Sequence, residues 1–277
     1  MKHHRKVIQN VFICSPLLKT CHSDGGTMMK SQRPLKIILL GYGKMGRAIE
    51  RIATEAGHEV VLHLNNDMQW KENEEVILQT DVAIEFSRPE AAFQNVANCI
   101  SAGIPVVCGT TGWAERLPEA RQYCTEKKGA FFYASNFSIG VYIFMETNRR
   151  LAQLMGSRPQ YKVSIEETHH IHKLDAPSGT AVTLAETVLP YLEHKKDWTL
   201  ETDLALPSDT LPIRSIRSGE VPGTHIITYQ SAIDTIVLSH EAHSREGFAA
   251  GAVEAAQWIV GKQGCFGMED MMRGTEI

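Results

Sequence analysis

Apolar residues gather in short runs along the first half of the chain, and amphipathic segments separate these runs. Runs of this length are consistent with strands that are buried in a parallel sheet. They predict strands at 35–40, 58–64, 81–86, 104–108 and 130–134, with helices at 47–56 and 89–102. The alternation of strand and helix predicts an α/β fold over residues 35–137, a Rossmann-like, doubly wound parallel sheet.

The pattern changes after residue 137. Residues 161–168 alternate as a strand does, with Val163 and Ile165 on one face and Ser164 and Glu166 on the other. Periodicity elsewhere predicts a helix near 141–155, a helix that opens at Ser178, strands at 224–230 and 234–240, and a last helix at 245–260. We therefore expect a second, mixed α+β domain over residues 138–244, and a C-terminal segment, 245–277, whose helix returns to the first domain.

Residues 1–34 precede the first predicted strand. We expect a disordered leader or an upstream choice of start, because Met28 and Met29 stand just before that strand. The chain begins with basic residues that an apolar stretch follows. We do not expect this segment to be a signal peptide, because Gln9, Asn10 and Pro16 interrupt the apolar stretch. No later stretch reaches the length of a membrane span, so we expect no membrane partner.

Composition is that of an enzyme-sized globular chain. The chain has 277 residues, of which 43% are hydrophobic, and a formal net charge of -4, which gives no long-range attraction to nucleic acid or anionic lipid. Its six cysteines form no C-x-x-C pair, which favours reduced thiols in a cytoplasmic protein. We interpret Cys108, at a strand end, as a small buried hydrophobe rather than a nucleophile.

Glycine-rich turns follow two of the predicted strands. The run Gly41-Tyr42-Gly43-Lys44-Met45-Gly46 lies between a strand and a helix, which is the context of a dinucleotide-binding loop; a tight turn without a ligand is the alternative. The turn Gly109-Thr110-Thr111-Gly112 follows the fourth strand, at the edge of the sheet where a nicotinamide ribose would lie. The segment Asn136-Phe137-Ser138 follows the fifth strand and could line the nicotinamide or form a hinge.

Proton-transfer and anion-binding groups are concentrated between Glu166 and Thr180. His169, His170 and Lys173 can exchange protons, and Pro177 stops any continuation of the strand. Ser178-Gly179-Thr180 opens a helix, whose first N–H groups are available to a carboxylate.

Other interpretations of this segment are weaker. His169, His170 and His172 could ligate zinc, but neighbouring residues of an extended segment point to opposite faces, so we expect no metal. For Glu166 and Glu167 a solvated or lysine-paired role is favoured over a paired-carboxylate site.

The residues of both halves resemble those of dihydrodipicolinate reductase, also called 4-hydroxy-tetrahydrodipicolinate reductase, of the diaminopimelate route to lysine. The likeness runs from Lys36 to about Met272. It is carried in order by Phe86-Ser87-Arg88-Pro89, Gly109-Thr110-Thr111-Gly112, Asn136-Phe137-Ser138, His169-His170-x-x-Lys173-x-Asp175-Ala176-Pro177-Ser178-Gly179-Thr180 and Arg217-x-Gly219-x-x-x-Gly223-x-His225.

The resemblance implies an oxidoreductase that uses NADH or NADPH on a small cyclic dicarboxylate, in a homotetramer built through the second domain. It assigns cofactor binding to 41–46, 109–111 and 135–138, catalysis to His169 and Lys173, and substrate binding to His170, Gly179 and Thr180. For Arg217, contact with a substrate anion or the cofactor and a surface loop charge are both open. Two other classes are less favoured: another two-domain dehydrogenase would not account for 173–180, and a silent redox sensor would be expected to lose His169 and Lys173.

Two features depart from the family pattern. Many members have one more residue in the glycine loop, and many carry an acidic residue followed by arginine where this chain has Asn65-Asn66. A carboxylate at that place normally accepts from the ribose 2′-OH and repels a 2′-phosphate. We therefore expect both nucleotides to be used, unless Asp67 takes the place of the missing carboxylate.

Overall fold

The computed structural model describes residues 33–65, 67–202 and 206–273. The expected leader, apart from its last two residues, and Asn66 therefore lie outside the described residues. None of the helices in these ranges has the length and apolar character that crossing a bilayer requires.

Five strands from the first half of the chain and one later strand, β11, build a parallel sheet of six strands in the order β11-β5-β4-β3-β1-β2. Its strands are β1 (Lys36–Leu40), β2 (Glu59–Leu64), β3 (Val82–Glu85), β4 (Val106–Cys108), β5 (Ala130–Tyr133) and β11 (Gly264–Phe266). The five strands expected from apolar runs are confirmed to within two residues at either end. The doubly wound, Rossmann-like fold is confirmed as well, with β11 as an edge strand that the pattern did not predict.

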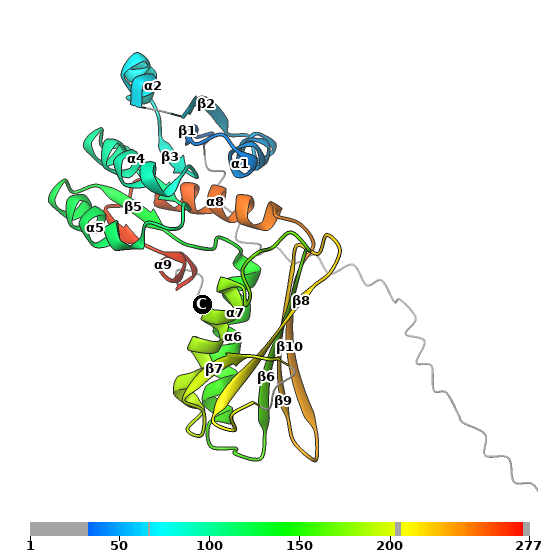
Figure 1. Ribbon diagram of the computed structural model, residues 1–277. Helices are drawn as coiled ribbons and strands as arrows, with labels where there is room; N and C mark the ends of the chain where they lie inside the picture. The colour runs from blue at the N-terminus through cyan, green and yellow to red at the C-terminus, as the bar shows by residue number, and fades with distance from the viewer. Residues whose placement is uncertain (1–32, 66, 203–205, 274–277) are drawn as a thin grey trace, which may run out of the picture. The chain divides into compact units, whose positions relative to one another are not determined.

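Helices cover both faces of this sheet (Figure 1). On one face lie α1 (Lys44–Glu55) and α8 (Glu246–Ile259), which contact each other, and on the other lie α4 (Pro89–Ser101) and α5 (Leu117–Glu126). Burial on both faces explains why the strands are continuous apolar runs rather than alternating ones. The helix α5 was not predicted from the sequence.

Shorter elements complete the part of the structure that surrounds the parallel sheet. They are α2 (Asp67–Glu72), α3 (Glu74–Ile77), the 3-10 helix η1 (Ala114–Arg116) and α9 (Met268–Arg273). Because β2 ends at Leu64, as expected, Asp67 begins a helix and does not extend the strand.

The second sheet is mixed and has five strands in the order β10-β9-β6-β8-β7. They are β10 (Thr235–Ala242), β9 (Gly223–Gln230), β6 (Lys162–His169), β8 (Thr210–Arg217) and β7 (Asp197–Leu200). The β6–β9 and β9–β10 pairs are antiparallel, whereas β6–β8 and β8–β7 are parallel. The expected second, mixed α+β part is confirmed, although β7 and β8 were not predicted.

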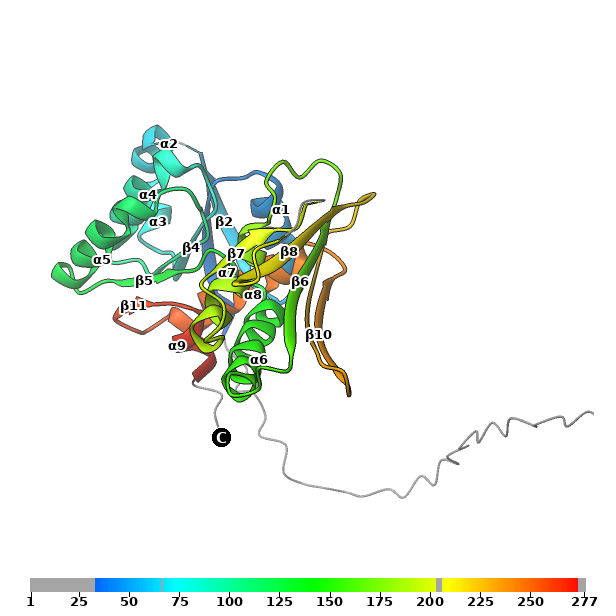
Figure 2. The ribbon, with the colours of Figure 1, turned by 60° about the horizontal axis from the view of Figure 1, so that its bottom comes forward.

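Two helices, α6 (Ile139–Met155) and α7 (Gly179–Val188), pack against one face of this sheet, followed by the 3-10 helix η2 (Leu189–Tyr191). Figures 1 and 2 show α6 beside the strands of this sheet. Alternation along β6 buries Val163 and Ile165 against the helices, as expected.

The register of the second sheet sets the positions of its polar residues. His169, the last residue of β6, pairs with Arg217 at the end of β8, and Glu167 pairs with His225 on β9. Paired residues on adjacent strands project from the same face, so this register places four polar side chains beside one another at the ends of three strands.

Candidate active site

The glycine loop between β1 and α1 is closely packed. Gly41 has φ +94°, and a Cβ there would lie 2.3 Å from the Phe86 carbonyl oxygen. A Cβ at Gly46 would lie 2.5 Å from the Gly41 carbonyl oxygen. Larger residues at these two positions would therefore force the loop apart.

Asn65 contacts the same loop. Its side-chain Oδ1 accepts a hydrogen bond of 3.2 Å from the Tyr42 N–H, and the Tyr42 ring stacks on His63 with ring centroids 3.9 Å apart. The amide that replaces the usual acidic residue thus stabilises the loop from the end of β2.

Two predicted cofactor loops line one cavity of about 390 Å³. The lining residues are Gly43, Lys44, Met45, Phe86, Ser87, Pro89, Gly109, Thr110 and Thr111. The Ser87 N–H donates to Thr110 Oγ1 at 2.8 Å, which fixes the loop after β3 to the loop after β4. Backbone N–H groups and Lys44 at a helix start are the donors that a pyrophosphate needs, so the residues fit a dinucleotide.

Cys108 is buried, as expected, beneath these loops. Its Sγ donates to the Glu85 carboxylate at 2.9 Å. Burial and the nearby Glu85 raise the pKa of the Cys108 thiol well above its usual range, so this thiol is not a nucleophile.

A second cavity, of about 380 Å³, is lined by residues of both halves of the chain. Ser135 and Asn136 line it together with Thr180 at the start of α7, while Tyr142, Met145 and Met268 contribute apolar surface. It thus brings together residues that the sequence assigned to the cofactor and to the substrate.

The other two residues of the 135–138 segment, Phe137 and Ser138, make contacts within the protein. Phe137 is only 2% exposed, and its ring packs against Phe86 and Phe132. Ser138 caps α6, because its Oγ accepts from the Val141 N–H at 3.3 Å. Any contact of Phe137 with a cofactor in this conformation would therefore come from its backbone.

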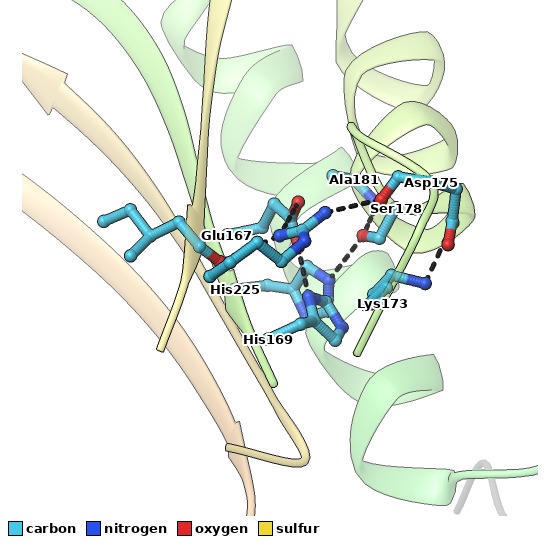
Figure 3. Close-up of polar contacts among 9 residues, drawn as sticks. Glu167, His169, Lys173, Asp175, Ser178, Ala181 and His225 are labelled. Carbon is cyan, nitrogen blue, oxygen red and sulfur yellow. Dashed lines mark hydrogen bonds and ion pairs between the residues drawn. The ribbon is translucent and has the colours of Figure 1, made fainter. Parts of the chain in front are cut away.

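His169 belongs to a buried polar network (Figure 3). Its Nδ1 is hydrogen-bonded to the Glu167 carboxylate, whose other oxygen accepts from Arg217 Nη1 at 2.9 Å. Glu167 is 0% exposed and His169 is 8% exposed. The expectation of a solvated or lysine-paired Glu167 was wrong, because the alternation of β6 places it on the helix-covered face, where histidine and arginine bind it.

The contacts of Glu167 determine the ionisation state of its carboxyl. Burial alone would raise the pKa of its carboxyl, but the hydrogen bonds from His169 and Arg217 outweigh burial and lower the pKa to about 2. Glu167 is therefore an anion at neutral pH. Glu166, on the opposite face, pairs with Arg214 at 3.6 Å instead.

Two more residues complete the surroundings of His169. The His225 ring meets it edge-on, with ring centroids 5.2 Å apart, and His225 Nε2 lies 3.2 Å from Ser178 Oγ. Burial, with a smaller effect of the charge on His169, lowers the pKa of His225 to about 4, so this ring is neutral at pH 7. Ser178 also caps α7 by accepting from the Ala181 N–H at 3.2 Å, which connects His169 to the start of that helix.

Lys173 lies in the loop between β6 and α7. Its Nζ donates to the Asp175 carboxylate at 2.9 Å, and this hydrogen bond lowers the pKa of Asp175. His172, in the same loop, is exposed, and its Nε2 lies 3.3 Å from the Glu220 carboxylate.

The predicted substrate residues surround the same loop and helix start. His170 has a buried Nδ1 without a hydrogen-bond partner. Gly179 and Thr180 are the first two residues of α7, so their N–H groups have no acceptor within the helix. The start of α7 therefore offers donors to an anion.

Among the described residues, the histidine and carboxylate atoms of Glu167, His169 and His225 lie within 4.8 Å of one another, as in a metal site. The Arg217 guanidinium already neutralises Glu167, and His169 Nδ1 is engaged by that carboxylate. A divalent cation would have to displace both contacts, so the residues fit a proton-transfer site better than a metal centre.

The role of Glu167 at this site and the contacts of Arg217 were not predicted from the sequence. Continuing the alternation of Val163 and Ile165 by one more pair would have placed Glu167 and His169 on one buried face. Arg217 carried no such signal, because its place depends on the register of β8.

Comparison with known proteins agrees with this architecture. A family model described as dihydrodipicolinate reductase, N-terminus, matches residues 35–137, and one described as dihydrodipicolinate reductase, C-terminus, matches residues 140–272. Among solved structures, dipicolinate-bound dihydrodipicolinate reductase from Paenisporosarcina sp. TG-14 has the same fold, with a TM-score of 0.66 at 23% identity over 86% of this chain and 99% of that one.

Similar curated proteins carry one name. 4-hydroxy-tetrahydrodipicolinate reductase from Christiangramia forsetii is 46% identical over 238 residues, which are 86% of this chain and 98% of the relative. The protein of that name from Neisseria gonorrhoeae is 31% identical over 86% of this chain and 97% of the relative. With both family models matched in order and relatives covered almost end to end, the chain belongs to the dihydrodipicolinate reductase family.

Proposed function

We propose that the protein reduces 4-hydroxy-tetrahydrodipicolinate to tetrahydrodipicolinate in the diaminopimelate route to lysine, with NADH or NADPH as the reductant. The observation that carries this proposal is a buried carboxylate–histidine pair adjoining a helix start that offers anion donors, in a chain of this family. A reduced nicotinamide nucleotide, when bound along residues 41–46, 109–111 and 135–138, supplies the hydride.

Proton transfer falls to His169 and Lys173. The substrate loses its hydroxyl group as water, and addition of hydride to the resulting conjugated imine leaves an electron-rich enamine that must be protonated on carbon. An imidazolium at His169, stabilised by the Glu167 carboxylate, can donate that proton. The Lys173 ammonium, once it leaves Asp175, can stabilise the charge that develops near the ring nitrogen.

The start of α7 accounts for binding of the dicarboxylate. The N–H groups of Gly179 and Thr180, the Thr180 hydroxyl and the helix dipole all favour an anion there. The buried, unpartnered Nδ1 of His170 can add a further hydrogen bond.

Thr180→Val is expected to raise KM for the substrate about tenfold or more and to change kcat much less, because a carboxylate contact exists in both the ground and transition states. Steady-state kinetics with freshly generated 4-hydroxy-tetrahydrodipicolinate measures this. Thr183→Val, on the same helix and lining the same cavity, is the matched control.

The same assay tests the substrate class. Pyridine-2,6-dicarboxylate, a planar analogue of the substrate, should compete with it and should bind the nucleotide complex in calorimetry. Absence of turnover together with absence of binding by this analogue would reject the proposed function.

Cofactor preference is expected to be weak. Asn65, already hydrogen-bonded to the glycine loop, does not repel a 2′-phosphate. Lys44 and Arg47, near the expected pyrophosphate site, add positive charge that either nucleotide could use. The kcat/KM values for NADH and NADPH should therefore agree within about thirtyfold, which corresponds to about 2 kcal/mol. A difference of more than about a hundredfold between the two kcat/KM values in steady-state kinetics would contradict this expectation. Asn65→Asp should shift the ratio of these values toward NADH, because a carboxylate there accepts from the ribose 2′-OH and repels a 2′-phosphate.

The working form that we propose is a cytoplasmic homotetramer built through the second sheet, without nucleic acid or membrane partners. In the described part of the chain no helix covers the face of that sheet opposite α6 and α7, and Val237 on it is 56% exposed. Light scattering on the purified protein measures the mass, and a monomer at micromolar concentration would reject the tetramer.

A further inference from the structure

We propose that Glu167 and Arg217 are positioning residues of this active site: Glu167 holds His169 with its proton on Nδ1, and Arg217 ties that carboxylate to the loop that carries Lys173. The inference rests on the proposed function for its kinetic part only. Neither residue needs to touch the substrate, because each acts through another side chain.

The first support is the burial of Glu167. A fully buried carboxylate is costly unless it is paired and hydrogen-bonded, and here both of its oxygens have partners. A hydrophobic residue of similar size would satisfy the packing of β6 on the helices equally well. The presence of a carboxylate at this place is explained if it orients His169.

The second support is that the Glu167 carboxylate binds the Nδ1 nitrogen of His169 and not Nε2. A carboxylate at Nδ1 can only accept, so Nδ1 carries the proton and Nε2 is left for exchange with a substrate. Residue 223, beside Nε2, is glycine, and a larger residue would crowd this nitrogen because a Cβ there would lie 3.0 Å from it. Geometry on both sides of the ring thus favours proton transfer through Nε2.

The third support is the double contact of Arg217. While Nη1 binds Glu167, Nη2 donates to the backbone carbonyl of Asp175, whose carboxylate holds Lys173. One guanidinium therefore fixes the orientation of His169 and the position of the Lys173 loop relative to each other. The planar guanidinium makes these two contacts from two separate nitrogens, whereas the ammonium of lysine would have to make both from a single nitrogen on a differently shaped side chain.

Charged and titratable groups on three strands face His169. Glu167 precedes it on β6, Arg217 ends β8, and His225 lies on β9, neutral at pH 7. Glu167 is the one anion among them, so a change in its charge should dominate the pH response of His169.

A mutant cycle tests this inference. Glu167→Gln should lower kcat at least about tenfold with nucleotide affinity unchanged, and should move the alkaline limb of the kcat profile to lower pH, because the imidazolium loses its anionic partner. In a His169→Gln background the same change should alter kcat less than about twofold. Glu166→Gln, with the same chemistry on the opposite face of β6, is the control and should leave kcat and the pH profile unchanged.

Arg217→Lys separates the two halves of the proposal. Lysine keeps a positive charge beside Glu167 but cannot hold the Asp175 carbonyl as well, so kcat should fall about tenfold without a shift of the pH profile. Activity within about twofold of the parent would overturn the role assigned to Arg217. Thermal unfolding of each variant shows whether it folds.

A measurement on the unaltered protein keeps the proposal testable if a variant fails to fold. Nitrogen chemical shifts of ¹⁵N-histidine-labelled protein, assigned by His169→Gln, should show His169 protonated on Nδ1 at the alkaline end of its titration. An Nε2-protonated ring, an unshifted pH profile in Glu167→Gln, or additive effects in the cycle would each overturn the inference. Because the shifts need no substrate, a lack of turnover by the parent would reject the proposed function and leave this result standing.

Discussion

Replacing His169 with glutamine is expected to lower kcat by about two or more powers of ten, because positioned proton transfer contributes on that scale. The ring is nearly buried and hydrogen-bonded to Glu167, so this proton donor is fixed in place. Glutamine preserves hydrogen bonding to the carboxylate but cannot exchange a proton. Nucleotide affinity, measured by fluorescence titration, should stay nearly unchanged, since the loops that would hold the cofactor are elsewhere.

His172→Gln is the matched control, because His172 lies three residues away, is exposed and contacts Glu220. It should retain activity. Turnover of His169→Gln within about threefold of the parent would remove His169 from the chemistry.

Lys173→Ala is expected to lower kcat by a similar factor, about two powers of ten or more, because alanine has no ammonium with which to stabilise the charge that develops beside the substrate ring nitrogen. In this structure the Lys173 ammonium binds Asp175 at 2.9 Å, so it must exchange that partner for the substrate. Steady-state kinetics measures kcat, and pyridine-2,6-dicarboxylate binding should weaken far less than kcat falls.

Lys196→Ala is the control for the loss of a lysine–aspartate pair, since Lys196 binds Asp209 at 3.0 Å on the surface. Surface pairs of this kind are worth little, so the variant should behave as the parent does. Equal kinetic losses in the two variants would show that the effect of Lys173→Ala is not catalytic.

Much of the fold follows from local pattern. The strands of the parallel sheet were predictable because burial on both faces leaves a continuous apolar run, as at 37–40. Strand β8 was not, because Pro212 stands in its middle and proline argues against an interior strand. Strand β11 has only three residues and carries too little pattern to be recognised.

The candidate site was predictable where its residues are neighbours in sequence. His169, Lys173 and the start of α7 fall within a short segment, and the strand–loop–helix pattern places them near one another. Arg217 and His225 reach the site only through the pairing of β6 with β8 and β9, which depends on contacts between distant segments. Roles for such residues could be proposed only once the register was known.

The helix α8 has a consequence for how the protein is made. Six of its side chains (Ala249, Ala252, Val253, Ala255, Ala256 and Ile259) belong to the core over the parallel sheet, and β11 adds an edge strand to β5. When residues 35–137 have emerged from the ribosome during synthesis, the loops expected to bind the nucleotide are therefore present. The helix α8, which packs on one face of the parallel sheet, is not. We expect the isolated 35–137 fragment to show little cooperative thermal unfolding by circular dichroism, whereas the full chain unfolds cooperatively. Cofactor binding would then become possible only after α8 and β11 have been synthesised, so that shorter chains would not withdraw nucleotide from the cell.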